Sequence, residues 1–240
     1  MQRRERTPVN PNAPIAPHAP ALSTEPATPA DITPSARLLQ AACVAVAPLL
    51  TREGLEAADE ASVGAVCEVL ACLSGEAVAP PSDAARRALG RDVLVAGLPL
   101  AALPVESLHK PWCGPDGTVR AARGMYGGES ARHVRALYAA CGLSVPEGFA
   151  AMPDHLALLL ELEAFFLEAD DASAARTLVC DHFDWLGAYD AMLAARAEQA
   201  ADALAFDMTK RRDLAQGIAF MRTMVRSMDR AVHAWAANAA

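Results

Sequence analysis

The sequence lacks the features that mark several well-known functional classes. Its six cysteines form no Cys-x-x-Cys pair and have no histidine at zinc-finger spacing, so we expect no structural zinc site. The spacing of Gly124, Gly127 and Gly128 matches neither a Walker nor a Rossmann phosphate loop. No apolar run approaches the roughly 18 to 20 residues of a membrane span. We therefore expect a soluble, cytoplasmic protein without stable membrane insertion.

Basic residues are also scarce. The chain has 21 Lys and Arg against 29 Asp and Glu, which gives a formal net charge of -8. Nucleic-acid binding depends on clustered Lys and Arg, so we expect no nucleic-acid partner. The short basic run at residues 210–212 is typical of a solvated helix face.

The first 33 residues lack aromatic residues and apolar periodicity, and they contain seven of the 17 prolines. Such a segment buries too little apolar surface to offset the entropy of ordering it. Arg3 and Arg4 are not followed by the apolar segment of roughly 7 to 15 residues that a secretion signal requires. We expect residues 1–33 to be a disordered, proline-rich tail.

From Pro34 onward the chain is rich in Ala and Leu and poor in β-branched runs, which favours helices throughout. Helix start and stop signals place the helices, with approximate ends, at residues 34–50, 56–73, 80–96, 129–141, 153–169, 173–180, 183–204 and 209–237. The fold class expected is all-α, a single globular helical domain of about eight to ten helices spanning residues 34–240.

Residues 97–129 form the least helical part of this domain, because they contain too many prolines and glycines for a long helix. A loop of this length is uncommon in a compact domain unless it has a function. Trp112 and Tyr126 indicate that it is packed against the domain.

The stretch FAAMPDHLALLLELEAFFLE, residues 149–168, is apolar on most sides and predicts a central helix. Pro153 is expected at its first helical position. Asp154 and His155 would then lie in the first turn, where the helix dipole favours a carboxylate and keeps the imidazole mostly neutral near pH 7. The start of this helix is expected at a surface or cleft.

Three interpretations of Asp154 and His155 remain open at this point: a catalytic or metal pair, a capping device, or a recognition pair at the rim of a pocket. A metal site would need further ligands, and the candidates are His133, Asp181, His182 and Asp184. On a helix, however, positions i and i+2 point to different sides. A nucleophilic Cys141 paired with His133 or His155 would lie at an apolar helix end.

Three segments in order, VESLHKPW (residues 105–112), GMYGGESARHVRALYAACGL (residues 124–143) and MPDHLALLLELEAFFLE (residues 152–168), carry a family resemblance. Together they resemble the TorD/DmsD-like family of cytoplasmic molybdoenzyme maturation chaperones, which is related to the NarJ group. Two positions depart from the family pattern. His109 stands where the family commonly has Tyr, and Ala150, Ala151 and Met152 stand where it often has a Glu.

The resemblance implies an all-helical protein that is not an enzyme and has no cofactor of its own. Its partner would be an apo molybdopterin oxidoreductase subunit, bound through the twin-arginine leader peptide or the body and held back from export until the cofactor is inserted. A monomer or homodimer is expected. The peptide-binding residues that the resemblance implies are Trp112, Tyr126, Gly128, Glu129, Asp154 and His155.

Two other functions compete with this interpretation. One is a helical metal-dependent hydrolase that uses His133, His155, His182 and nearby Asp residues. The other is a helical regulatory or scaffolding domain that has no leader-peptide client.

Overall fold

The structure is a computed structural model and describes residues 34–113, 119–120, 126–203 and 206–238. The expected tail, residues 1–33, lies outside the described residues. Its disorder and the division of the chain into tail and domain therefore stay predictions.

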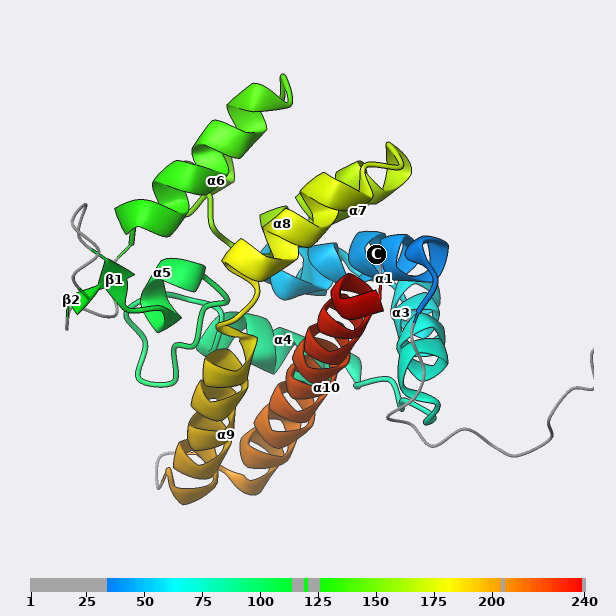
Figure 1. The fold of residues 1–240 in the computed structure, drawn as a ribbon. Helices are drawn as coiled ribbons and strands as arrows, with labels where there is room; N and C mark the ends of the chain where they lie inside the picture. The colour runs from blue at the N-terminus through cyan, green and yellow to red at the C-terminus, as the bar shows by residue number, and fades with distance from the viewer. Residues whose placement is uncertain (1–33, 114–118, 121–125, 204–205, 239–240) are drawn as a thin grey trace, which may run out of the picture.

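Helices form nearly all of the regular structure (Figure 1). The α-helices of the described residues are α1 (Ala36–Val46), α2 (Arg52–Ala57), α3 (Glu60–Ser74), α4 (Asp83–Asp92), α5 (Glu106–His109), α6 (Gly128–Ala140), α7 (Leu156–Glu168), α8 (Ala172–His182), α9 (Leu186–Asp202) and α10 (Met208–Asn238). Two 3-10 helices, η2 (Ala47–Leu50) and η3 (Glu147–Phe149), and two antiparallel strands, β1 (Trp112–Cys113) and β2 (Val119–Arg120), complete the set. The all-α prediction is confirmed, with this two-residue ladder as a small addition.

Short polar side chains set several of the helix starts. The side chains of Ser35, Thr51, Asp59, Ser82 and Asp171 each accept a backbone N–H of the helix that follows. Such caps satisfy donors that have no partner within the helix. The first helix accordingly begins at Ala36, two residues later than the sequence predicted. Its N-cap is Ser35, which follows Pro34.

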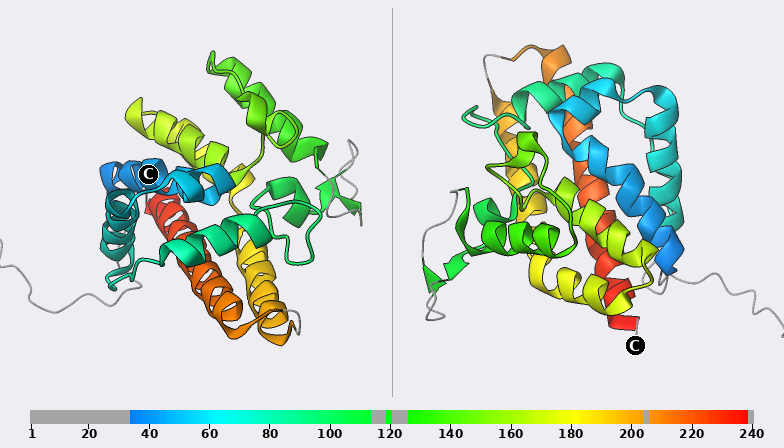
Figure 2. Two further views of the ribbon diagram at one scale, coloured as in Figure 1. Left: turned by 180° about the vertical axis from the view of Figure 1, so that it is seen from behind. Right: turned by 90° about the horizontal axis from the view of Figure 1, so that it is seen from above.

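The long helix α10 packs along α9 and crosses α4, as the views in Figures 1 and 2 agree. Gly217 makes the crossing possible, since a Cβ at this position would lie 2.6 Å from the carbonyl oxygen of Ala85. None of the described helices, α10 included, is long and apolar enough to cross a membrane. On the left of Figure 1, α6 lies with β1 and β2 beside α5.

The helix α7 lies at the centre of the core, as its sequence predicted. It packs against α1 on one side and α8 on the other. Leu159 is 0 % exposed and Leu162 is 1 % exposed, and Phe166 is also buried. Its neighbour Phe165 instead points outward, with 38 % of its surface exposed.

The described part of the long loop is packed, as expected. Leu100, Ala102 and Val105 are buried in the core. The hydroxyl of Tyr189 donates to the carbonyl of Ala102 at 3.2 Å, and the guanidinium of Arg196 donates to the preceding carbonyl at 3.0 Å. The segment therefore follows α9 closely before α5 begins.

The five cysteines whose side chains the structure describes differ in burial. Cys43 and Cys67 are buried thiols, as small hydrophobic residues would be. Cys72 and Cys180 are exposed, and Cys141 is half-buried. The exposed cysteines also have apolar neighbours in the sequence. A helix places successive residues on different faces, so apolar neighbours do not by themselves predict burial.

A carboxylate lies within this core. Glu163 of α7 is 0 % exposed, and neither of its carboxylate oxygens has a hydrogen-bond partner among the described residues. Burial disfavours the charged form and raises the pKa of Glu163 to about 8. Burial also raises the pKa of Cys43 on α1, and the nearby charge of Glu163 adds to that rise. Glu163 is therefore protonated at neutral pH in the folded protein.

Because α7 lies at the centre of the core, removing a large side chain from its buried face should strongly lower the free energy of unfolding. Replacing Leu162 with Ala should lower the free energy of unfolding by about 2 to 5 kcal/mol, out of a total of about 5 to 15 kcal/mol. Chemical denaturation of the parent and the variant measures this difference. Phe165→Ala, in the same helix but facing outward, is the control and should cost far less; a Leu162→Ala protein as stable as the parent would contradict the placement of α7.

The buried Glu163 predicts a specific pH dependence. Because the folded state holds a proton that the unfolded chain releases, the parent should lose stability relative to Glu163→Gln as pH rises from about 4.5 to about 8. The change across this window should be on the order of 3 to 5 kcal/mol. Urea unfolding at a series of pH values measures it. Glu168→Gln, at the exposed end of the same helix, is the control, and parallel stability curves for parent and Glu163→Gln would show that Glu163 is not buried as described.

Candidate functional site

The start of α7 differs from the prediction by three residues. The helix begins at Leu156, and His155 is its N-cap with extended backbone angles. The Nδ1 atom of His155 accepts the backbone N–H of Ala157 at 3.1 Å. Pro153 is therefore not the first helical residue, and Asp154 lies outside the helix.

His155 is neutral, as expected, but for another reason. The ring is 4 % exposed, and burial lowers its pKa to about 4. Its Nδ1 must also stay unprotonated to accept the capping N–H. The edge of Phe149 meets the imidazole, with ring centroids 5.0 Å apart.

The carboxylate of Asp154 faces inward instead of lining the rim of a pocket. The residue is 0 % exposed, and its Oδ2 atom accepts the backbone N–H of Ser107 at 2.7 Å. Burial raises the pKa of Asp154, and the hydrogen bond from Ser107 opposes this rise. The expectation that Asp154 directly meets a ligand at a surface is not met in this structure; its carboxylate holds the backbone of α5.

Backbone hydrogen bonds join the same two segments. Leu156 donates to the carbonyl of Pro104 at 2.8 Å, and Glu106 donates to the carbonyl of Asp154 at 3.1 Å. Val105 and His155 form an antiparallel bridge between these bonds. The start of α5 and the start of α7 are therefore fixed to each other by main chain and side chain together.

A second buried carboxylate, that of Glu106, joins α5 to α6 and α8. Its Oε1 atom accepts from Lys110 at 3.1 Å and from the hydroxyl of Ser130 at 2.9 Å. Its Oε2 atom lies 2.7 Å from Nδ1 of His182, and Glu106 is 0 % exposed. Sequence reasoning missed this residue, although its place within the segment VESLHKPW among apolar neighbours was a signal.

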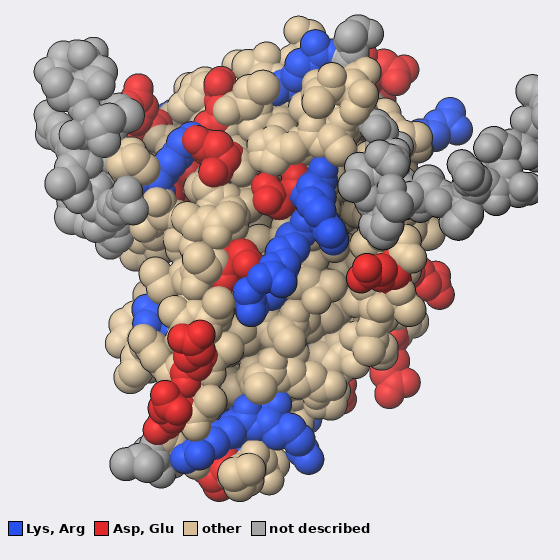
Figure 3. Space-filling model, turned by 60° about the horizontal axis from the view of Figure 1, so that its bottom comes forward, with Lys and Arg blue, Asp and Glu red and all other residues tan. Residues whose placement is uncertain are grey.

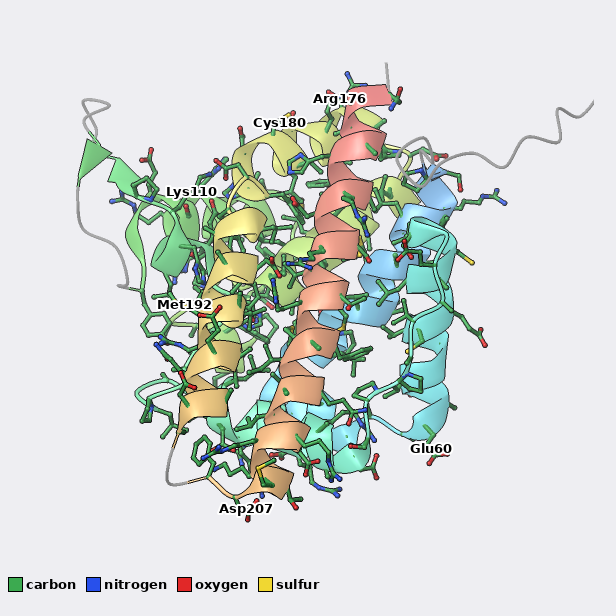
Figure 4. The ribbon with its side chains drawn as sticks, turned by 90° about the horizontal axis from the view of Figure 1, so that it is seen from below. Glu60, Lys110, Arg176, Cys180, Met192 and Asp207 are labelled. Carbon is green, nitrogen blue, oxygen red and sulfur yellow. The ribbon has the colours of Figure 1, made fainter. Side chains whose placement is uncertain are left out.

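Lys110 links this cluster to the turn after α8. Its ammonium lies 2.8 Å from Asp184 and donates to the carbonyl of Asp181 at 2.7 Å. Burial lowers the pKa of Lys110, but the contacts with Asp184 and Glu106 outweigh this effect, so its pKa is raised. Figure 4 shows Lys110 and Cys180 of α8 at the same end of the molecule.

Two of the candidate metal ligands, His133 and His182, contact each other through their imidazole rings. Nε2 of His182 lies 2.9 Å from Nδ1 of His133. Residues 181–184, which include three of these candidates, form the end of α8 and the following turn. His155 lies in a different hollow of the surface, and no group of three or more His, Cys, Asp or Glu among the described residues is arranged to hold a metal ion.

His109 is the position at which the chain departs from the resembled pattern. Its imidazole stacks on Trp185 with ring centroids 5.3 Å apart and also packs against Tyr189. Its Nε2 atom hydrogen-bonds the carbonyl of Leu103 at 2.9 Å, and burial lowers its pKa. The histidine thus fills an aromatic packing position between α5 and α9.

Two hollows flank α5. The first, called the apolar cleft below, has a volume of about 590 Å³. Its lining comprises Leu50, Thr51, Arg52, Glu53, Leu94, Val95, Ala96, Leu103, Pro104, Tyr126, Gly148, Phe149, Ala151, Met152 and His155. The second, called the α6–α8 groove, has a volume of about 620 Å³ and is lined by Lys110, Pro111, Gly127, Glu129, Ser130, Arg132, His133, Asp181 and His182.

The residues singled out in the sequence are divided between these hollows. Tyr126, 42 % exposed, lines the apolar cleft together with His155. Glu129 lines the α6–α8 groove beside Gly128, the first residue of α6 with a φ of 81°. Trp112 contributes its backbone to β1, and its side chain lies outside the described atoms. Asp154 is buried, and Tyr126 and Glu129 line different hollows, so the described side chains of this set do not form one pocket.

Charges of both signs alternate on the face drawn in Figure 3. Arg222 and Arg226 of α10 both bind Asp190 of α9, at 2.8 Å and 2.9 Å. Much of the positive charge is therefore paired within the protein, which fits the scarcity of basic residues in the sequence.

The buried imidazole of His155 predicts a loss of stability in acid. Because its folded pKa is about 4 and that of an unfolded histidine is about 6.5, stability should fall as pH drops through this window, by up to about 3 kcal/mol. His155→Asn keeps an acceptor near the position of Nδ1 but does not titrate, so this component should vanish. Unfolding curves at about pH 7 and about pH 4.5 measure the difference. His233→Asn, at an exposed position, serves as the control, and an equal acid loss in parent and His155→Asn would contradict the burial of the ring.

Comparison with known proteins identifies the family. A family model described as the nitrate reductase delta subunit matches residues 92–224, which include α5 to α9 and all the lining residues of the α6–α8 groove. No curated protein and no solved structure matches the chain. The expected kinship with the NarJ group is thereby confirmed, whereas membership of the TorD/DmsD-like branch stays a prediction. Because the match spans more than half of the 240 residues, the protein belongs to the nitrate reductase delta subunit family, whose members are molybdoenzyme maturation chaperones and not enzymes.

Proposed function

We propose that this chaperone binds the twin-arginine leader peptide, or another exposed segment, of an apo molybdopterin oxidoreductase subunit, with the apolar cleft as the main contact. It holds that subunit in the cytoplasm until the molybdopterin cofactor has been inserted. The observation that carries the proposal is the position of Tyr126 and His155, two residues with an expected role in peptide binding, in the wall of one apolar cleft.

The cleft suits an apolar peptide segment. Its volume of about 590 Å³ falls in the range of about 300 to 1,000 Å³ that is usual for ligand sites. Leu94, Phe149 and Met152 supply apolar walls, while Arg52 and Glu53 lie among the lining residues as polar groups. A groove of this kind can receive the apolar face of a helix or the side chains of an extended segment.

The residues to which we assign a role in peptide binding, by contact or by positioning, are Trp112, Tyr126, Gly128, Glu129, Asp154 and His155. Among them, Asp154 acts through α5, because its buried carboxylate positions the N–H of Ser107. Tyr126 and Glu129 are exposed and can touch the peptide directly. The molybdopterin belongs to the client, and this proposal assigns no cofactor to the chaperone itself.

Affinity capture from the native cell tests the proposal most directly. The tagged full-length protein should bring down a molybdopterin oxidoreductase subunit that carries a twin-arginine leader. A synthetic peptide of that leader should then bind the purified chaperone in a calorimetric titration. Absence of both the subunit and peptide binding would overturn the proposal in favour of a helical scaffolding domain without such a client.

Tyr126 should contribute measurably to the affinity. Tyr126→Ala removes an exposed aromatic anchor from the cleft and should weaken leader binding about tenfold. Leu143→Ala is the matched control, since Leu143 is a similarly exposed apolar residue that lines neither hollow. The melting temperature of Tyr126→Ala should stay near that of the parent, and unchanged affinity would place the peptide elsewhere.

A further inference from the structure

A chain of hydrogen bonds runs from the core of the protein to the α6–α8 groove. It begins at Oε2 of Glu106, passes through both ring nitrogens of His182, and ends on the imidazole of His133. The two contacts measure 2.7 Å and 2.9 Å. Glu106 and His182 are buried, whereas His133 is exposed on α6.

The carboxylate at the inner end fixes the direction of the first hydrogen bond, and the direction of the second follows for the neutral form of His182. A carboxylate only accepts hydrogen bonds, so Nδ1 of His182 donates to Glu106. Nε2 of a neutral His182 must then accept, and the donor is Nδ1–H of His133. This assignment leaves Nε2 of His133 as a hydrogen-bond acceptor at the surface.

Two carboxylates line the groove beside this acceptor. Glu129 precedes His133 by four residues on α6, so both side chains lie on the same face of the helix. Asp181 enters from α8. Within the part of the chain that the structure describes, neither carboxylate forms an ion pair.

The positive charges near the groove do not balance the negative charges of Glu129 and Asp181. The ammonium of Lys110 already contacts Glu106, Asp184 and the carbonyl of Asp181, which engages its three N–H donors. Arg132 is the remaining cation among the described lining residues. The groove therefore presents two carboxylates and an imidazole nitrogen against one guanidinium.

We propose that the α6–α8 groove binds an arginine side chain of the client peptide, through Glu129, Asp181 and Nε2 of His133. A guanidinium carries five N–H donors in a planar fork and bonds carboxylates in pairs, so it can engage several acceptors together. This inference rests on the proposed function and gives the arginine pair a place that the buried Asp154 cannot provide. The buried Glu106 and His182 act as positioning residues that hold His133 with its acceptor outward.

The groove also lies where a peptide in the apolar cleft would reach it. Tyr126 lines the cleft and Gly127, the next residue, lines the groove. Consecutive Cα atoms are about 3.8 Å apart, so residues that are adjacent in the chain line the two hollows. A peptide that crosses Tyr126–Gly127 can place its apolar segment in one hollow and its arginines in the other.

Paired peptides and paired variants test this inference. The probe is a synthetic peptide with two adjacent arginines before an apolar segment, and its comparison forms carry two lysines or two glutamines instead. The test variant is Glu129→Gln combined with Asp181→Asn, both at exposed positions so that folding is preserved. The control variant is Glu60→Gln combined with Glu168→Gln, which removes the same net charge outside the groove; Figure 4 shows Glu60 far from Lys110.

The parent should bind the arginine peptide about tenfold more tightly than the lysine or glutamine forms. The test variant should lose about tenfold in affinity for the arginine peptide and little for the glutamine peptide, while the control variant should keep most of its affinity. His133→Phe retains a ring but no acceptor, so it should also reduce the preference for arginine. Its melting curve checks that the fold is intact.

The outcomes separate this inference from the proposed function. If the parent binds the arginine and glutamine peptides equally, or the test variant binds the arginine peptide like the parent, the groove does not hold arginine and only the apolar contact remains. If none of the peptides binds, and the captured client's leader does not bind either, the proposed function is wrong and this inference is wrong with it.

Discussion

The buried carboxylate of Glu106 is the constraint on which the arrangement around α5 depends. A carboxylate removed from water is costly unless several donors surround it. Here the donors are Lys110, Ser130 and His182, which come from α5, the start of α6 and the end of α8. Satisfying one charge therefore fixes three separate helices, and two of them, α6 and α8, line the α6–α8 groove.

The start of α7 depends on a similar requirement. Asp154 accepts the N–H of Ser107, and His155 accepts the N–H of Ala157, so each side chain satisfies a backbone donor at a helix start. Both residues are buried as a result. Their contribution to the proposed peptide binding is to fix the geometry of the cleft wall, since a preformed surface lowers the cost of binding.

An acidic chaperone with two unlike hollows fits a client segment that has two unlike parts. The apolar cleft offers Leu94, Phe149 and Met152, whereas the α6–α8 groove offers carboxylates and an imidazole. Electrostatic attraction adds to specificity and to the rate of encounter, and apolar burial adds to affinity. Adjacent residues, Tyr126 and Gly127, line the two hollows, so the two proposals together have one short peptide use both, and neither contact needs a catalytic group.

The sequence by itself determined the helical class, the central position of α7 and the packing of the loop segment before α5, because apolar periodicity, capping residues and chain breakers act over a few residues. It also singled out Tyr126 and His155, through residues whose order resembles a family. Only the tertiary structure decided that Asp154 faces inward and that Glu106, His182 and His133 form one chain of hydrogen bonds. Those contacts join residues as many as 76 positions apart, and the choice of partner for a buried charge depends on the packing of whole helices, which no local pattern specifies.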